Sequence, residues 1–249
     1  SPYTIYQSRL RFGDIIGIVG VEGETSEELQ SNIQKLSFEK LFVDIGAKSK
    51  EEAERICPIG TFGTFDSYFY KQGEYMVSKS MDDRIGCAVL IETFRRLSSP
   101  KNTIYGVFAV QEEVGLIGAH VAGYDINPDV AIALDVTAVG DTPKGMKRIP
   151  MELGKGACIK VKDTASISNR HIVNKLKELA EKYNIAHQME VLIFGGTDAA
   201  GYQATKAGIP SATISIPTRY IHTPSEMVLE SDVEASILLT MKYCEEGLE

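Results

Sequence analysis

The stretch RIGCAVLIETFRRLSSPKNTIYGVFAVQEE, residues 84–113, combines two kinds of apolar pattern. Its first part, residues 84–97, places apolar side chains at the spacing of an amphipathic helix. Residues 103–110 then form a continuous apolar run, which is typical of a β-strand buried on both faces. A helix followed by such a strand predicts an α/β fold, with helices packed on the faces of a sheet.

The same alternation continues along the rest of the sequence. Strand-like patterns occupy residues 129–137, 156–163, 187–194 and 211–217, and helical patterns occupy residues 115–124, 169–183, 198–208 and 232–247. Such a series favours a mostly parallel sheet sandwiched by helices. We therefore predict that residues 80–249 form an α/β domain.

Residues 1–79 have a different character. Short strand-like segments with frequent glycines occupy residues 4–12, 14–21, 41–46, 60–65 and 67–78. Between them, residues 25–38 predict a surface excursion or a short helix, and residues 48–56 predict a helical turn capped by Ser49. Short strands at this density predict a small antiparallel β-barrel, which forms the first domain.

Composition argues against several classes of function. A chain of 249 residues with 43% hydrophobic residues can bury a sizeable core, and its net charge of -8 opposes binding to nucleic acid or anionic membranes. The sequence has neither an apolar run of the ~20 residues that a membrane helix needs nor the pattern of a signal peptide, so we expect a soluble cytoplasmic protein. Its four cysteines lie far apart without CxxC spacing, which predicts free buried thiols.

Acidic residues follow two of the predicted strands directly. Glu112 and Glu113 come after residues 103–110, and Asp135 ends the apolar part of residues 129–137. Ligands of open α/β sheets gather at the carboxyl ends of strands, so these positions are candidates for a functional site. Taken singly, the glutamates are more simply explained as solvated side chains at a strand end, and Asp135 as a turn-forming residue.

Two further positions carry groups that could bind a cation. Asp82 and Asp83 precede the first predicted helix, where a helix N-cap is the simpler explanation, and His222 lies in the loop after residues 211–217. Together, Asp82, Glu113, Asp135 and His222 supply the carboxylate and imidazole donors of a zinc-like two-metal centre. Glu112 remains beside them as a carboxylate able to act as a general base, although one terminal ligand is lacking and no HExxH spacing occurs.

Five segments together resemble the TET-type dinuclear metallo-aminopeptidases, a family that includes glutamyl and deblocking aminopeptidases and members labelled endoglucanase. They are SMDDRIGCAVLIE (80–92), VQEEVGLIGA (110–119), IALDVT (132–137), GGTDAAGYQATKAGIP (195–210) and ISIPTRYIHTPSEM (214–227). The resemblance extends from about residue 10 to the last helix. It implies a zinc-exopeptidase-like catalytic domain over residues 80–249 and a small β-barrel dimerisation domain over residues 1–79.

The resemblance also implies a role for each matching residue. Asp82 would bridge two metal ions, and its peptide bond to Asp83 would be cis. Glu112 would be the general base, Glu113 and His222 would bind one metal, and Asp135 would bind the other. The wall of the substrate cleft would be formed by Gly195, Gly196, Thr197 and Asp198.

One feature of that family has no counterpart in the sequence. Its members carry an early histidine, in an HxD motif, as a second terminal ligand of the metal that Asp135 binds, whereas no histidine precedes His120 here. We expect an N-terminal segment with the first strands and that histidine to be missing from this chain, a loss at the gene level being the alternative. One metal would then keep only Asp82 and Asp135, bind weakly, and leave the activity of the chain impaired.

The leading hypothesis is an aminopeptidase that removes N-terminal residues from peptides with two divalent metal ions, zinc being expected and cobalt or manganese being alternatives. Relatives form dimers that build tetrahedral dodecamers, so a homo-oligomer is expected as well. Two other hypotheses stay open. A glycosidase with a carboxylate pair is disfavoured by the lack of tryptophan, and an assembly module without catalysis would follow from the missing histidine.

Overall fold

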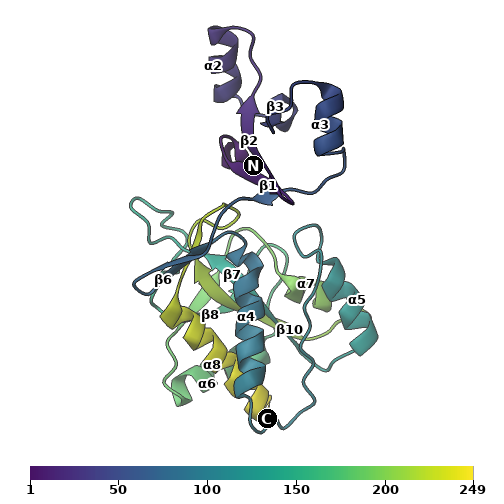
Figure 1. The fold of residues 1–249 in the computed structure, drawn as a ribbon. Coiled ribbons are helices and arrows are strands. Elements are labelled where there is room, and N and C mark those ends of the chain that lie inside the picture. The colour runs from purple at the N-terminus through teal and green to yellow at the C-terminus, as the bar shows by residue number, and fades with distance from the viewer. Residues whose placement is uncertain (249) are drawn as a thin grey trace. The chain divides into compact units, whose positions relative to one another are not determined.

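The computed structural model describes residues 1–248, which form two compact units (Figure 1). The smaller unit contains residues 1–69 and Thr223–Ser225, and the larger contains Tyr70–His222 and the segment that begins at Glu226. Residues 70–78 belong to the larger unit because their strands pair with a strand from its C-terminal part. The division into domains after residue 79 stays a prediction.

The smaller unit contains one antiparallel sheet with three short helices and a 3-10 turn. The elements are α1 (Pro2–Ile5), β1 (Arg9–Phe12), β2 (Ile15–Val21), α2 (Ser26–Gln34), η1 (Phe38–Lys40), β3 (Leu41–Asp44), α3 (Lys50–Ile56) and β4 (Thr64–Phe65). The strand order is β3-β2-β1-β4. Within residues 1–248, β3 and β4 do not pair to close this sheet, so the β-barrel stays a prediction.

Two helices of this unit, α2 and α3, begin where the sequence predicts, whereas α1 overlaps the start of a segment expected as a strand. Ser49 precedes α3, and its hydroxyl accepts a hydrogen bond from the N–H of Glu52 at 3.2 Å. Thr25 caps α2 in the same way, accepting from the N–H of Glu28 at 3.1 Å. Each cap satisfies one backbone donor of the first turn, which has no partner inside the helix. Both the capped turn and the short helix are thereby confirmed.

The larger unit is an α/β structure with a four-stranded central sheet. Its elements are β5 (Tyr70–Gln72), β6 (Tyr75–Ser78), α4 (Met81–Arg96), α5 (Ile117–Ile126), β7 (Ala131–Ala138), β8 (Ala157–Lys162), α6 (Arg170–Lys182), β9 (His187–Val191), α7 (Asp198–Gln203), β10 (Ser211–Thr218), β11 (Glu226–Leu229) and α8 (Glu230–Glu246). The central order is β7-β10-β8-β9, and a second sheet has the order β11-β6-β5. In the central sheet, β10 runs parallel to β7 but antiparallel to β8, so the sheet is mixed rather than mostly parallel.

Helices pack on the central sheet through apolar stripes. α6 buries Ile172, Leu176 and Leu179 completely, and these residues form one core with β8 and β10. α4 and α8 lie against each other and cover the strands in the view of Figure 1, with α5 and α7 beside them. None of the helices in residues 1–248 has both the length and the apolar character needed to cross a bilayer.

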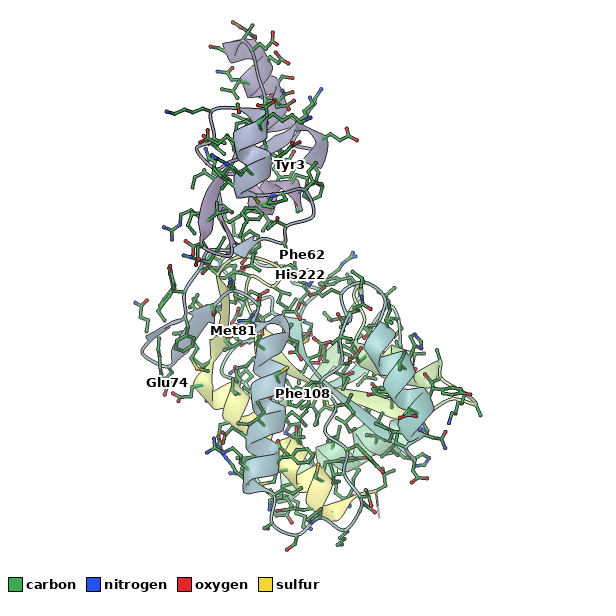
Figure 2. The ribbon with its side chains drawn as sticks, turned by 45° about the vertical axis from the view of Figure 1, so that its right-hand side comes forward. Tyr3, Phe62, Glu74, Met81, Phe108 and His222 are labelled. Carbon is green, nitrogen blue, oxygen red and sulfur yellow. The ribbon has the colours of Figure 1, made fainter. Side chains whose placement is uncertain are left out.

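The predicted strand at residues 103–110 is wrong. This segment has no regular secondary structure, and in the described part of the chain no strand pairs with it. Tyr105, Phe108 (labelled in Figure 2) and Val110 are exposed by 62%, 56% and 67%. A strand exists through hydrogen bonds to a neighbouring strand, so an apolar run without a partner does not form one.

Candidate metal centre

The first part of the site lies at the beginning of α4. Asp82 and Asp83 have non-helical dihedral angles (φ −77°, ψ 104° and φ −119°, ψ 48°), and the peptide bond between them is cis, as the resemblance implies. The Oδ1 atom of Asp83 accepts a hydrogen bond from the N–H of Gly86 at 3.1 Å. A Cβ atom at Gly86 would lie 2.2 Å from Asp83 Oδ2, so only glycine lets this carboxylate lie against the helix.

Asp135 approaches from the central sheet. It lies within β7, opposite Ser215 of β10, and is 8% exposed. Its Oδ1 atom accepts from the N–H of Val136 at 2.7 Å. The sequence predicts a strand over residues 129–137, and β7 spans Ala131–Ala138. Asp135 is therefore held by a strand on both sides, which restricts its position.

A tight turn after residues 103–110 carries the two glutamates. The carbonyl of Glu112 accepts from the N–H groups of Gly115 and Leu116, at 3.1 and 3.0 Å. Gly115 has φ +124°, a conformation that favours glycine, and Gln111 and Leu116 also have positive φ. The turn thus presents Glu112 and Glu113 side by side just before α5.

His222 comes from the loop after β10. Its Nε2 atom lies 2.9 Å from Asp82 Oδ2 and 3.3 Å from Glu113 Oε2. Figure 2 labels His222 near the end of α4 that begins at Met81, the residue before Asp82. Three segments that are far apart in the sequence therefore bring one imidazole and two carboxylates together.

The donors form two groups that share Asp82. One group is Asp82, Glu113 and His222, and the other is Asp82, Asp83 and Asp135; in each, the candidate ligand atoms lie within 4.8 Å of one another. Carboxylate oxygen and imidazole nitrogen suit zinc, cobalt and manganese. The sequence marks Asp83 as a candidate beside Asp82 without assigning it to a metal, whereas the structure places its carboxylate in the second group.

Burial dominates the electrostatics at the start of α4, and repulsion between neighbouring carboxylates adds to it. Burial, followed by the charge of Glu113, raises the pKa of Asp82 to about 6. Burial also raises the pKa of Asp83 to about 8, with the charge of Asp82 adding to it, although the N–H of Gly86 opposes the shift. Carboxylates that cannot all ionise together need protons or a cation between them.

The neighbouring carboxylates follow the same rule. Burial raises the pKa of Glu112 to about 7, with contributions from Glu113 and Asp198, and it raises the pKa of Asp135 well above its ordinary value. His222 is the group that lowers the pKa of Glu112. The site thus has an excess of buried negative charge of the kind that divalent metal ions compensate, and its residues fit such ions.

A cavity of about 980 Å³ opens beside these groups. Asp82, Asp83, Glu112, Asp135 and Asp198 line it together. The cavity continues away from the acidic groups along residues 102–109 and β7, where its walls are largely apolar. A substrate with a polar reacting group and an apolar side chain would find both kinds of surface here.

The predicted cleft residues at 195–198 differ in their surroundings. Asp198 lines the cavity with the other acids. Thr197 is 1% exposed, and its hydroxyl lies 2.8 Å from the hydroxyl of Thr213. Gly195 has φ +78°, and a Cβ atom at Gly196 would lie 2.8 Å from Ala165 Cβ. The role of all four in a substrate cleft stays a prediction.

The charge excess has a consequence for stability without metal. In the unfolded chain, Asp82, Asp83 and Glu112 ionise near their ordinary pKa values, whereas in the folded chain their pKa values rise to about 6, 8 and 7. Folding therefore takes up protons, and the metal-free chain should lose stability as the pH rises from about 4 to about 8. We expect the melting temperature to fall by several degrees over this range. Excess Zn²⁺ should largely cancel the fall, and equal slopes with and without metal would contradict this explanation.

Comparison with known proteins identifies the family to which the chain belongs. The model of the M42 glutamyl aminopeptidase family matches residues 3–239. Lysyl aminopeptidase of Pyrococcus furiosus is 37% identical over 253 residues, covering 98% of this chain and 72% of the relative. The solved structure of aminopeptidase APDkam598 from the archaeon Desulfurococcus kamchatkensis superposes with a TM-score of 0.91 at 34% identity, covering 99% of this chain and 71% of that one.

A further solved structure is that of the TET1 peptidase of Pyrococcus horikoshii, described as able to assemble into a tetrahedron or a large octahedral shell. It has a TM-score of 0.79 at 27% identity, covering 99% of this chain and 74% of that one. The chain thus spans between 71% and 74% of the lengths of these relatives. On the family match and the lysyl aminopeptidase identity, the chain belongs to the M42 glutamyl aminopeptidase family of metal-dependent hydrolases.

Proposed function

We propose that this chain is an aminopeptidase that hydrolyses N-terminal residues from peptides at a centre of two divalent metal ions. The observation that carries this proposal is the pair of donor groups that share Asp82, with Glu112 in the cavity that Asp82, Asp83 and Asp135 line. A shared carboxylate between two sets of terminal donors is what a two-metal site requires. The match to aminopeptidases supports peptides as the substrate class.

The donor groups suggest how the ligands are divided. Asp82 would bridge the two ions, Glu113 and His222 would complete one site, and Asp135 would be the terminal ligand of the other. The Asp83 carboxylate lies in the same group as Asp135 and is available to that second ion. The site with the imidazole should bind zinc more tightly, because zinc prefers nitrogen donors to a set of carboxylates alone.

Glu112 would perform the proton transfers. When bound, the two metal ions would polarise the scissile carbonyl group and lower the pKa of the attacking water. Glu112 would take the proton from that water and pass it to the leaving amine. Its side chain is half-buried beside Glu113 and lines the same cavity as Asp82 and Asp135, within reach of a water held there.

We also propose that the chain acts as a homo-oligomer of dimers assembled into a tetrahedron. The support is the TET1 peptidase, whose structure is described as assembling in that form. Large exposed apolar side chains in both units are compatible with subunit contacts, for example Ile59 and Phe62 in the smaller unit and Phe108 and Val121 in the larger.

The proposed activity is tested with peptides that differ only at their N-terminus. The chain loaded with Zn²⁺, Co²⁺ or Mn²⁺ should shorten a peptide with a free amino group one residue at a time and leave the N-acetylated peptide intact, as mass spectrometry would show. EDTA should stop the trimming, and re-addition of the metal should restore it. Trimming that persists in EDTA would contradict the proposal, and metal-independent release of sugar from cellulose would instead support a glycosidase.

A further inference from the structure

Glu226 connects two of the proposed metal ligands. It is the first residue of β11 and is 2% exposed. Its Oε2 atom accepts a hydrogen bond from the N–H of Asp82 at 3.0 Å, and its Oε1 atom accepts from the N–H of His222 at 2.6 Å. One buried side chain therefore binds the backbones of two residues that are far apart in the sequence.

The backbone around Glu226 is itself well fixed. β11 pairs antiparallel with β6, and Glu226 lies opposite Ser78, the last residue of the strand that leads into α4. Hydrogen bonds of the strand pair hold the main chain of Glu226, while its two carboxylate oxygens hold the main chains of Asp82 and His222. An ionised carboxylate accepts such bonds more strongly than a neutral group does.

The side chains of Asp82 and His222 belong to the same group of candidate metal ligands. His222 Nε2 lies 2.9 Å from Asp82 Oδ2, and His222 has φ +63°, a conformation that a non-glycine residue adopts only where its surroundings require it. The hydrogen bond to the N–H of His222 is one such requirement. Without it, the loop would be free to turn the imidazole away from Asp82.

We propose that Glu226 is a positioning residue that fixes the separation of Asp82 and His222, so that the carboxylate and the imidazole bind the same metal ion. This inference rests on the proposed metal centre and adds a residue that does not itself bind the ion. Both oxygens of Glu226 are directed to backbone N–H groups. Partners that orient metal ligands in this way typically affect affinity by about 10- to 100-fold.

The test is a titration of the metal-free chain with Co²⁺. Calorimetry measures the affinity, and the visible absorption of the bound ion reports its ligands. Glu226→Gln retains one carbonyl oxygen and replaces the other by a donor, so it cannot accept from both N–H groups. We expect it to bind Co²⁺ about 10- to 100-fold more weakly than the wild-type chain, with an altered absorption spectrum. Glu230→Gln is the matched control, since Glu230 is an exposed neighbour that pairs with Lys71 and should leave the affinity unchanged.

A second variant keeps the inference testable if Glu226→Gln does not fold. Glu226→Asp retains the charge but is one methylene shorter, so it should reach only one of the two N–H groups and show a similar loss of affinity. If either folded variant binds Co²⁺ as tightly as the wild-type chain and with the same spectrum, Glu226 has only a structural role and the inference is overturned. A wild-type chain that binds no Co²⁺ would overturn the proposed centre as well, which distinguishes the two failures.

Discussion

Replacing Glu112 by glutamine should lower kcat for an amino-acid 4-nitroanilide by about 100- to 10,000-fold, the range that general acid–base catalysis contributes. Glutamine has nearly the same shape as glutamate, but it cannot take a proton from the attacking water. KM should change little, because Asp82, Glu113, Asp135 and His222 remain in place. The measurement is steady-state kinetics of the metal-loaded chain and the variant.

The metal content separates this loss from damage to the centre. Glu112→Gln should retain as much Zn²⁺ as the wild-type chain, whereas the adjacent Glu113→Gln should lose Zn²⁺ affinity, because Glu113 is a proposed ligand beside His222. The two glutamates are neighbours in one turn, so the pair of variants forms a matched comparison. A Glu112→Gln chain that keeps its kcat within about threefold would exclude Glu112 as the general base.

The second large effect concerns stability rather than catalysis. Lys160 is 1% exposed, and its Nζ atom lies 3.0 Å from Glu190 Oε1 and 3.5 Å from Asp163 Oδ2. Thr137 also donates a hydrogen bond to Glu190, at 2.8 Å. Lys160→Met would leave two buried carboxylates without their cation, so it should reduce the free energy of unfolding by about 3–5 kcal/mol.

Chemical denaturation of the metal-free chain measures this loss. Lys177→Met is the control, because Lys177 pairs with Glu181 on an exposed helix face and should change the free energy of unfolding by less than about 1 kcal/mol. The double variant Lys160→Met/Glu190→Gln should recover part of the lost free energy of unfolding, since it removes one of the two buried carboxylates that have no cation. A loss below about 1 kcal/mol for Lys160→Met would show that solvent or a proton compensates the buried acids.

Most of the larger unit could be predicted from local patterns. The amphipathic spacing of residues 169–183 identifies α6, and the apolar runs at 129–137 and 211–217 identify β7 and β10. These patterns suffice because each segment buries its apolar face against a neighbour in the same unit. The direction of β8 could not be predicted, because no local pattern records which strand lies beside it.

Residues 103–110 show the limit of the same reasoning. Their apolar run carries the signal of a buried strand, yet Tyr105, Phe108 and Val110 are exposed and no strand pairs with them in residues 1–248. Within the described residues, β7 pairs only with β10, so its other edge also has no partner strand. An apolar pattern indicates that a segment could be buried in a sheet. Only the structure shows whether a neighbouring strand pairs with it.

The candidate centre shows a similar division. The sequence singles out Asp82, Glu112, Glu113, Asp135 and His222 by residue type and by position at the ends of predicted strands or the start of a predicted helix, and the structure brings all five together. The sequence assigns no role at the site to Asp83 or Glu226, because their contributions depend on how the backbone bends. The fold of α4 turns Asp83 towards Asp135, and Glu226 acts through two N–H groups that a sequence does not display.

The number of divalent ions bound per chain tests the central claim most directly. We predict two zinc ions per wild-type chain at saturation, measured by equilibrium dialysis against excess zinc so that a weakly held ion stays bound, and two for Glu112→Gln. Asp82→Asn should reduce the content below one, because both donor groups share Asp82. A wild-type chain that binds no zinc at saturation, or an Asp82→Asn chain that still binds two, would contradict a centre built around Asp82.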